Sequence, residues 1–534
     1  MRGTQGSSFS RLRVVAGLAA AVLGIAMCLT AAPATAAPPS PSPSPAPSAR
    51  SSGSTAAAPT DIVCTAGLDG RPVNCPSALP ASKLPASAKS QAVVAAPVTD
   101  PAQLVDTRTW TTGGGNTFPG AEVPFGMVQW SPDTMPRRSA GGGYSFGDTS
   151  LTGYSLTHVS GPGCGAGGDV PILPITGALP SGNPNSVLTS FSNSGEVAQA
   201  GYYSAQSNQP NTITSEFTAT SHSSMGRFTF PATTQAGFLV KLHDSQNGEF
   251  APSTAQIVND HEIAGTQTSG HFCGEANNDG QQQEYTVHFD LVFDHPFTAS
   301  QIITQSGQSE PAAVYLTFDT TSNPVIQAKV GTSYVSTDNA KLDWQTENAD
   351  WNFSGIKATA QQDWNALLGK IQVDGGSVAQ TQQFYSNLYK GFIQPNISSD
   401  VNGEYMGADM KAHTVGGQQH DQYGTFSGWD TFHSLSQLQA MLDPAAASDH
   451  AQSLLNYYAQ DKILQQWGYL NLNNYVMVGD PAQSIIADYY AFGARDFDTK
   501  AALADMLAQA TTVNDVRPGE ALEQQYGYLP EDGK

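Results

Sequence analysis

The sequence predicts a multidomain protein in which an antiparallel β-sandwich precedes a region of helices. The chain of 534 residues is long enough for about three domains. Apolar and polar residues alternate in many short stretches before residue 340, as they do in half-buried strands. After Lys341 the apolar spacing becomes that of amphipathic helices.

The predicted β-sandwich spans residues 99–340. The clearest alternation lies at 285–293, and similar patterns occur at 227–231, 238–243 and 314–318. A buried helix at 285–293 is the alternative, and it is disfavoured because a strict period of two does not form one helical face.

Helices are predicted to dominate the rest of the chain, with a helical linker at 341–375 and a helical domain at 376–534. The spacing of apolar residues predicts helices from Trp364 to Ile371, Phe384 to Phe392, Phe432 to Leu442, Ser453 to Trp467, Pro481 to Phe492 and Thr499 to Ala510. Asp498 is expected to cap the last of these through its carboxylate. Successive helices of this length are compatible with a toroid, although the stretch is too short for a complete double ring.

The first 36 residues have the pattern of a cleaved signal peptide. A basic start to Arg13 precedes an apolar run from Val14 to Leu29, and Ala34-Thr35-Ala36 offers the small residues of a cleavage site. A membrane anchor is the alternative, but the run is shorter than the roughly 20 residues needed to span a bilayer. We therefore expect a secreted, extracellular protein with no stable membrane anchor.

Residues 37–60 are rich in Pro and Ser and are expected to form a disordered spacer, followed by a short cysteine-containing lead-in at 61–98. Cys28 leaves with the leader, so four cysteines remain in an oxidising compartment. Three pairings are possible. A short loop favours Cys64 with Cys75, which leaves Cys164 with Cys273; free buried thiols are the alternative. The spacings do not resemble a zinc site.

Acidic residues outnumber basic ones, 45 against 23, for a net charge of −22. Such a chain repels phosphate backbones, which argues against nucleic acid as a partner. The Gly-rich stretch at 113–115 lacks the Lys and Ser or Thr of a nucleotide-binding loop. Neutral, hydroxyl-rich ligands fit this composition better.

Loops dense in Gly and Pro carry the most specific signal. They comprise Gly113–Gly120, Val123–Met127, Gly153–Gly165 and Asp169–Pro174, and are followed much later by Asp400–Tyr405, Gly428–Phe432 and Ile486–Asp488. In this order the segments resemble glycoside hydrolase family 92, whose members are secreted exo-acting α-mannosidases. The resemblance runs from about Thr99 to Lys534.

The resemblance implies a β-sandwich, a helical linker and an incomplete (α/α)6 barrel, and calcium-assisted, inverting release of terminal mannose from a glycan. Inversion needs a carboxylic acid and a carboxylate base roughly 6.5 to 9.5 Å apart. In the family the acid follows a Gly-Tyr-Val-Pro-like stretch, which Gly527-Tyr-Leu-Pro matches here. We therefore expect the acid, the base and the calcium ligands beyond Lys534. The adjacent Glu531 and Asp532 are interpreted as solvated charges.

Substrate-binding residues are expected within the chain. Asp430 matches a carboxylate that contacts the terminal mannose in the family, and Trp429 beside it offers an aromatic face. An Asp that caps a helix beginning at Thr431, next to a core Trp, is the alternative. His433 stands where many relatives carry Arg, which removes a permanent cation.

Asn116 and His158 lie in loops that resemble those facing the barrel, and both are candidate sugar contacts. The alternatives are an Asx-turn at Asn116 and a buried His158 bonded to a backbone carbonyl. Asp169 is interpreted mainly as a strand cap, and Asp480 and Asp488 are left unassigned.

Two other functions fit parts of the sequence. A non-catalytic, secreted carbohydrate-binding protein would keep the sandwich, but would have no reason to retain residues 400–533. A structural cell-surface protein would suit the acidic composition and the spacer, but not the many loop glycines.

Overall fold

The computed structural model describes residues 98–138, 140–247, 252–270, 272, 284–305 and 307–530, all in one compact unit. The predicted leader, the spacer and nearly all of the lead-in lie outside these residues, as do Glu531 and Asp532. Predictions for those segments therefore stay predictions, and so do the domain boundaries.

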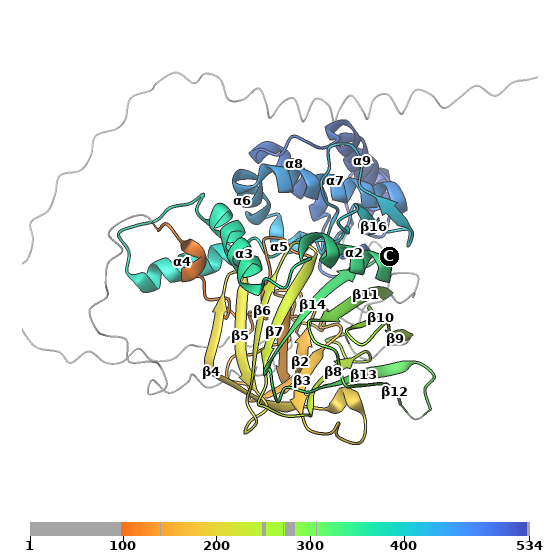
Figure 1. The fold of residues 1–534 in the computed structure, drawn as a ribbon. Coiled ribbons are helices and arrows are strands. Elements are labelled where there is room, and N and C mark those ends of the chain that lie inside the picture. The colour runs from red at the N-terminus through yellow and green to blue at the C-terminus, as the bar shows by residue number, and fades with distance from the viewer. Residues whose placement is uncertain are drawn as a thin grey trace, which may run out of the picture. The chain divides into compact units, whose positions relative to one another are not determined.

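The predicted antiparallel β-rich domain is confirmed (Figure 1). In the described residues, 14 strands form one sheet in the order β12-β13-β8-β3-β2-β4-β5-β6-β7-β14-β11-β10-β9, with β1 also paired to β2. The strands are β1 Ser131–Met135, β2 Ser150–Ser155, β3 Ile172–Thr176, β4 Thr189–Gln199, β5 Tyr202–Ser207, β6 Ile213–Ala219, β7 Ser223–Thr229, β8 Ala236–Lys241, β9 Ser253–Ile257, β10 Glu262–Gly270, β11 Glu284–Phe293, β12 Ala299–Thr304, β13 Pro311–Phe318 and β14 Val325–Ser333.

The sheet folds back on itself and nearly closes, because β9 at one end packs beside β13 near the other. The expected sandwich is thus one continuous sheet whose two halves face each other, and not two separate sheets. Only two residue pairs, Ser150 with Ser190 and Leu151 with Thr189, join the halves between β2 and β4.

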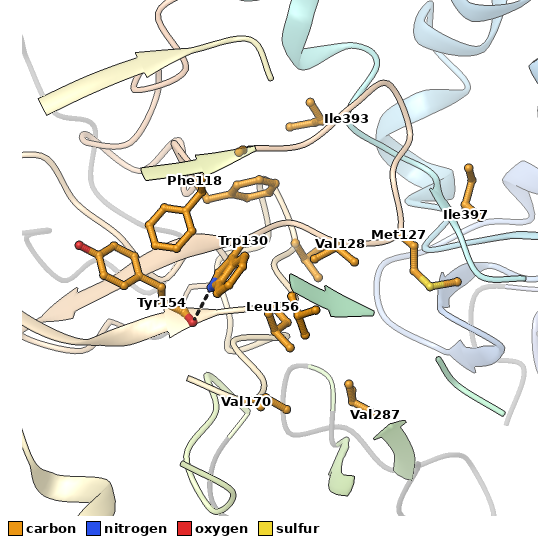
Figure 2. Close-up of a cluster of buried hydrophobic side chains, with 14 of the residues drawn as sticks. Phe118, Met127, Val128, Trp130, Tyr154, Leu156, Val170, Val287, Ile393 and Ile397 are labelled. Carbon is orange, nitrogen blue, oxygen red and sulfur yellow. Dashed lines mark hydrogen bonds between the residues drawn. The ribbon is translucent and has the colours of Figure 1, made fainter. Parts of the chain in front are cut away.

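Aromatic side chains fill the space between the two halves. Phe238 on β8 lies 4.8 Å from Phe228 and 5.1 Å from Phe293, measured between ring centroids. Trp130 is fully buried, and its indole N–H donates to the carbonyl of Tyr154 at 3.2 Å (Figure 2). These contacts explain the alternating pattern, since every second residue of β11 points into this core.

The two helices that follow β14, the last strand of this sheet, pack on the sheet domain. Helix α2, Thr337–Glu347, packs on β14 and β11, and α3, Phe353–Leu368, packs on β6. Ser336 and Asn352 cap them by accepting from backbone N–H groups. Helix α4, Val378–Lys390, begins with a capping box and leads to the helical domain.

The helical domain follows the sheet domain, as predicted (Figure 1). Its helices are α5 Gly428–Thr431, α6 Leu435–Leu442, α7 Pro444–Asp461, α8 Pro481–Phe492, α9 Thr499–Thr511 and α10 Glu520–Tyr526. The described residues also form three two-stranded sheets. Two of them precede α5, namely β15 Asn396–Ile397 with β18 Tyr423–Gly424 and β16 Glu404–Met406 with β17 Ala412–Thr414, and the third, β19 Trp467–Tyr469 with β20 Leu472–Asn474, lies between α7 and α8.

Some helix bounds match the predictions and others do not. The prediction for 481–492 is confirmed by α8, and Asp498 caps α9 by accepting from the N–H groups of Lys500 and Ala501. The prediction of a helix from Ser453 to Trp467 is wrong at its end. Helix α7 stops at Asp461 because Lys462 adopts a left-handed conformation with φ of 69°, and Trp467 begins a strand.

Two further helix bounds are also corrected. The helix expected from Phe432 begins only at Leu435, and the one expected to reach Ile371 ends at Leu368. Within the part of the chain that the structure describes, no helix has the length and apolar character required to span a membrane.

Candidate functional site

A cavity of about 370 Å³ lies between a loop of the sheet domain and the helical domain. Ser160–Cys164 form its wall on the sheet side, and Thr425–Ser427 and Asp430 face it from the helical side. Its volume falls within the range of small-ligand sites. We take this cavity, called the junction pocket, as the candidate site.

Backbone contacts hold the Ser160–Cys164 loop in place. Gly161 donates its N–H to the carbonyl of Asn116 at 3.0 Å, and Gly141 donates to the carbonyl of Pro162 at 3.2 Å. Only Gly fits at position 142, because a Cβ there would meet the carbonyl oxygens of Asn116 and Thr117 at 2.6 Å. The Gly-rich sequence thus allows three backbone segments to approach closely.

Aromatic rings form much of the remaining wall. Phe272 stacks on Trp467, with ring centroids 4.1 Å apart, and Phe426 and Tyr489 complete this side. Phe272 and Trp467 are only 2% and 3% exposed, so a small apolar part of each ring reaches the pocket, where the C–H surface of a sugar ring can pack against it. Phe272 belongs to the sheet domain and Trp467 to β19, so this wall forms only where the two domains pack together.

Among the described residues that line the junction pocket, only Lys390 and Asp430 carry a charge. The Lys390 ammonium donates to the carbonyls of Thr107 at 2.9 Å and Phe118 at 3.1 Å. Burial lowers the pKa of Lys390 to about 8. These two hydrogen bonds of Lys390 join α4 to the sheet domain.

Asp430 lies in the first turn of α5, and its carboxylate accepts a hydrogen bond from the Ser427 hydroxyl. Trp429 is 41% exposed and is therefore not the core Trp of the alternative interpretation. Its ring contacts Phe432 and His433, and it does not line the junction pocket. Asp430 is thus placed at the pocket, whereas the sugar contact of Trp429 stays a prediction.

His158 is placed behind the pocket wall. Its side chain is fully buried, with Nδ1 3.0 Å from the carbonyl of Gln129 and Nε2 3.1 Å from Asp133. The ring packs on Phe118 at 5.3 Å. This is the arrangement of the alternative interpretation, a buried His bonded to a backbone carbonyl, and the predicted contact with sugar stays a prediction.

Asn116 adopts a left-handed conformation with φ of 51° and lines a second, smaller cavity of about 130 Å³. Its carbonyl supports Gly161, so Asn116 lies between this cavity and the junction pocket. Its predicted contact with sugar likewise stays a prediction.

The other acids noted in the sequence have structural partners. Asp169 is fully buried and accepts from Thr157 and Tyr285, both at 2.7 Å, and burial raises its pKa. Asp480 accepts from Gln509 at 2.8 Å, which joins α9 to the segment before α8. Asp488 accepts from Gln437 at 2.7 Å, across the interface of α8 and α6.

Cys164 lines the junction pocket and is disulfide-bonded. The other cysteines of the predicted pairs, Cys64, Cys75 and Cys273, lie outside the described residues. The two pairings therefore stay predictions.

Comparison with known families assigns both parts of this structure to the glycosidases. Residues 104–333 match the Glycosyl hydrolase family 92 N-terminal domain, and residues 339–534 match the Glycosyl hydrolase family 92 catalytic domain. The chain therefore belongs to glycosyl hydrolase family 92, as the resemblance predicted.

Solved structures and a curated protein agree with this assignment. The fold is similar to that of a family GH92 alpha-mannosidase from Bacteroides thetaiotaomicron, with a TM-score of 0.72, 26% identity and 82% of this chain covered. That mannosidase has also been solved in complex with mannoimidazole. A second mannosidase from the same organism, described as inverting, has the same fold, with a TM-score of 0.69 and 23% identity.

A protein of Arthroderma benhamiae, described as an uncharacterized secreted glycosidase, is 27% identical over 337 residues, which is 57% of this chain. This chain spans 42% of the length of that glycosidase and 59% of the length of the first mannosidase.

Proposed function

We propose that this chain supplies the sugar-binding part of a secreted exo-α-mannosidase, which releases terminal mannose from glycans with inversion. Family membership supports the glycosidase class, and the mannosidase solved with mannoimidazole supports mannose as the sugar. The observation that carries the proposal is the position of Asp430 at the junction pocket.

In the proposed complex, a mannose ring occupies the junction pocket. The Asp430 carboxylate accepts hydrogen bonds from adjacent sugar hydroxyls, which are strong because the acceptor is charged. The ring packs against the Phe272 and Trp467 side of the wall. These contacts bind and orient the sugar, and the Ser427 hydroxyl fixes the carboxylate for that role.

Proton transfer is assigned to none of the described residues. Inverting hydrolysis needs a carboxylic acid that protonates the leaving oxygen and a carboxylate that activates water, roughly 6.5 to 9.5 Å apart. Asp430 is the only carboxylate that lines the junction pocket among the residues the structure describes. The proposal therefore includes an (α/α)6 barrel whose remaining part supplies both groups.

Calcium dependence is also part of the proposal. Calcium in proteins is held by six to eight oxygen ligands, mainly from carboxylates and carbonyls. Across residues 98–530, leaving out the gaps given above, no group of three or more His, Cys, Asp or Glu side chains could hold a metal ion. These side chains alone do not form a calcium site, so the proposed calcium ligands lie outside the described residues, and no step of the proposal passes through calcium.

A second candidate is a non-catalytic carbohydrate-binding protein. The single carboxylate at the junction pocket favours it, because one carboxylate can bind a sugar but cannot provide both the acid and the base of inversion.

Calorimetric titration of the chain ending at Lys534 with methyl α-mannoside tests the proposal. We expect saturable binding, weaker binding of methyl α-glucoside, and no release of mannose from an α-mannobioside by this chain. Absence of binding to any mannoside would contradict both candidates. Release of mannose would contradict the assignment of proton transfer to groups outside the described residues.

A further inference from the structure

A cluster of ionisable side chains lies where α2 meets the segment that leads to the helical domain. Asp343 comes from the middle of α2, and Asp400 comes from the loop between β15 and β16. Asp343 is fully buried and Asp400 is 1% exposed. Neither residue lines the junction pocket, and neither belongs to the proposed sugar-binding site.

One oxygen of each carboxyl group has ordinary donors. Asp343 Oδ1 accepts from the N–H of Val401 at 2.9 Å. Asp400 Oδ2 accepts from the Ser333 hydroxyl at 2.8 Å and from the Asn339 amide at 2.7 Å. These bonds fix both carboxyl groups in the interface.

The other oxygen of each group is buried and lacks a donor. Asp343 Oδ2 and Asp400 Oδ1 have no hydrogen-bond partner among the described residues. The two carboxyl groups are close neighbours, because Asp343 binds the N–H of Val401, the residue after Asp400, while Asn339, one turn before Asp343 on α2, binds Asp400. Two adjacent, buried negative charges without a donor between them would be strongly unfavourable.

One cation lies near the pair. His222, from the turn between β6 and β7, binds Glu347 of α2 through Nδ1 at 2.6 Å, and its Nε2 lies 3.7 Å from Asp421. Its positive charge lowers the pKa of both Asp343 and Asp400, but burial raises both pKa values more strongly. The remaining neighbours add no cation: Glu404 of β16 shares Asn339 with Asp400, and the buried Tyr334 follows β14.

We propose that Asp343 and Asp400 hold one proton between their unpartnered oxygens, and that this shared proton attaches α2 to the segment leading into the helical domain. The proton turns one carboxyl group into the donor that the other lacks. Because the proton is lost as the pH rises, the same pair makes the attachment of the helical domain sensitive to alkaline conditions.

The direction of the pKa shifts agrees with this geometry. Burial, and then the charge of Asp400, raise the pKa of Asp343 well above the usual range of an Asp, and burial also raises the pKa of Asp400. The folded chain thus binds a proton that the unfolded chain releases above about pH 4. Stability from this proton is present at low pH and is lost as the pH rises towards the folded-state pKa.

Asp343→Asn is the sharpest test, because the amide is neutral at every pH and can donate to Asp400 while its oxygen still accepts from Val401. Denaturant unfolding of the full chain would be measured from about pH 5 to about pH 9. We expect the unfolding equilibrium constant of the unmodified chain to rise, relative to the variant, by up to about tenfold per pH unit. Asp338→Asn, an exposed change on the same helix, is the matched control.

Infrared spectroscopy gives a second readout that a purely structural role would not change. We expect the carbonyl band of a protonated carboxylic acid at neutral pH to lose the same intensity in Asp343→Asn and in Asp400→Asn, and none in Asp338→Asn. Two unchanged spectra, or a pH dependence of stability equal to that of the Asp343→Asn variant, would overturn the proposal. If either Asp343→Asn or Asp400→Asn does not fold, the infrared spectrum of the other variant decides between these outcomes.

Discussion

The hydroxyl groups of Tyr285 and Tyr469 lie 2.9 Å apart, although 184 positions separate them in the sequence. Tyr285 belongs to β11 of the sheet domain and donates to Asp169 at 2.7 Å, so Tyr469 of β19 is the donor between the two hydroxyls. Their rings are perpendicular, with centroids 5.2 Å apart. Tyr469 also packs on Phe272, a wall residue of the junction pocket. This pair therefore joins the two domains directly behind the candidate site.

Tyr285→Phe is expected to destabilise the chain by about 1–3 kcal/mol, because Asp169 loses a donor while it stays buried. Tyr469→Phe should cost less, about 0.5–1.5 kcal/mol, because the bond it loses is between neutral groups. Denaturant unfolding of both variants and of the half-exposed control Tyr490→Phe would measure this. A Tyr285→Phe variant as stable as the control would show that the junction does not depend on this bond.

His450 is predicted to make the helical domain sensitive to acid. It is fully buried among Phe125, Tyr423, Phe426 and Tyr489, and neither ring nitrogen has a hydrogen-bond partner among the described residues. Burial lowers the pKa of His450 to about 3. The unfolded chain therefore binds a proton that the folded chain rejects, and stability falls as the pH drops from about 6.5 towards 3.

The slope from this one residue is at most about 1.4 kcal/mol per pH unit. His450→Leu should remove it, whereas the exposed control His433→Leu should keep it. Unfolding free energies measured between about pH 4 and pH 7 would separate the two variants. Parallel curves for His450→Leu and the unmodified chain would mean that His450 titrates normally.

Gly142→Ala is predicted to disturb the junction pocket from outside it. The added Cβ would meet two backbone carbonyl oxygens at 2.6 Å, including that of Asn116, which supports Gly161 of the pocket loop. We expect a loss of about 1–3 kcal/mol of stability, together with weaker mannoside binding. Gly416→Ala, where no atom lies within 4 Å, is the control and should have little effect. Unchanged binding in Gly142→Ala would separate the loop from the ligand site.

The disulfide of Cys164 offers a chemical test. Peptide mapping without reduction should recover Cys164 linked to Cys273, and Cys64 linked to Cys75. Cys164→Ser should cost about 2–4 kcal/mol in unfolding experiments, because the crosslink no longer restricts the unfolded chain. Any other linkage of Cys164 would refute the predicted pairing.

Local patterns in the sequence predicted much of the fold. The alternation at 285–293 corresponds to β11, and Pro481 to Phe492 corresponds to α8. Both predictions are correct because the pattern of apolar residues that indicates the strand or helix lies within that element itself. The error after Ser453 has the opposite cause, since the apolar residues up to Trp467 serve first a helix and then a hairpin, and a left-handed residue at 462 separates them.

The candidate site was only partly predictable. Asp430 was found through a motif, but Lys390, Phe272, Trp467 and Tyr489 were not, although all four line the junction pocket. They come from four separate segments of the chain, namely α4, the loop after β10, β19 and α8, and each has the local pattern of an ordinary helix, strand or loop residue. Only the packing of the helical domain against the sheet domain brings them together, and no spacing in the sequence records that packing.

Calorimetric titration of methyl α-mannoside into the Asp430→Ala variant tests the central claim most directly. Loss of a charged acceptor should weaken binding by about 1.5–3 kcal/mol, whereas Asp496→Ala, an exposed change elsewhere in the helical domain, should bind like the unmodified chain. Equal affinities for the Asp430→Ala variant and the unmodified chain would contradict the assignment of the junction pocket as the sugar-binding site.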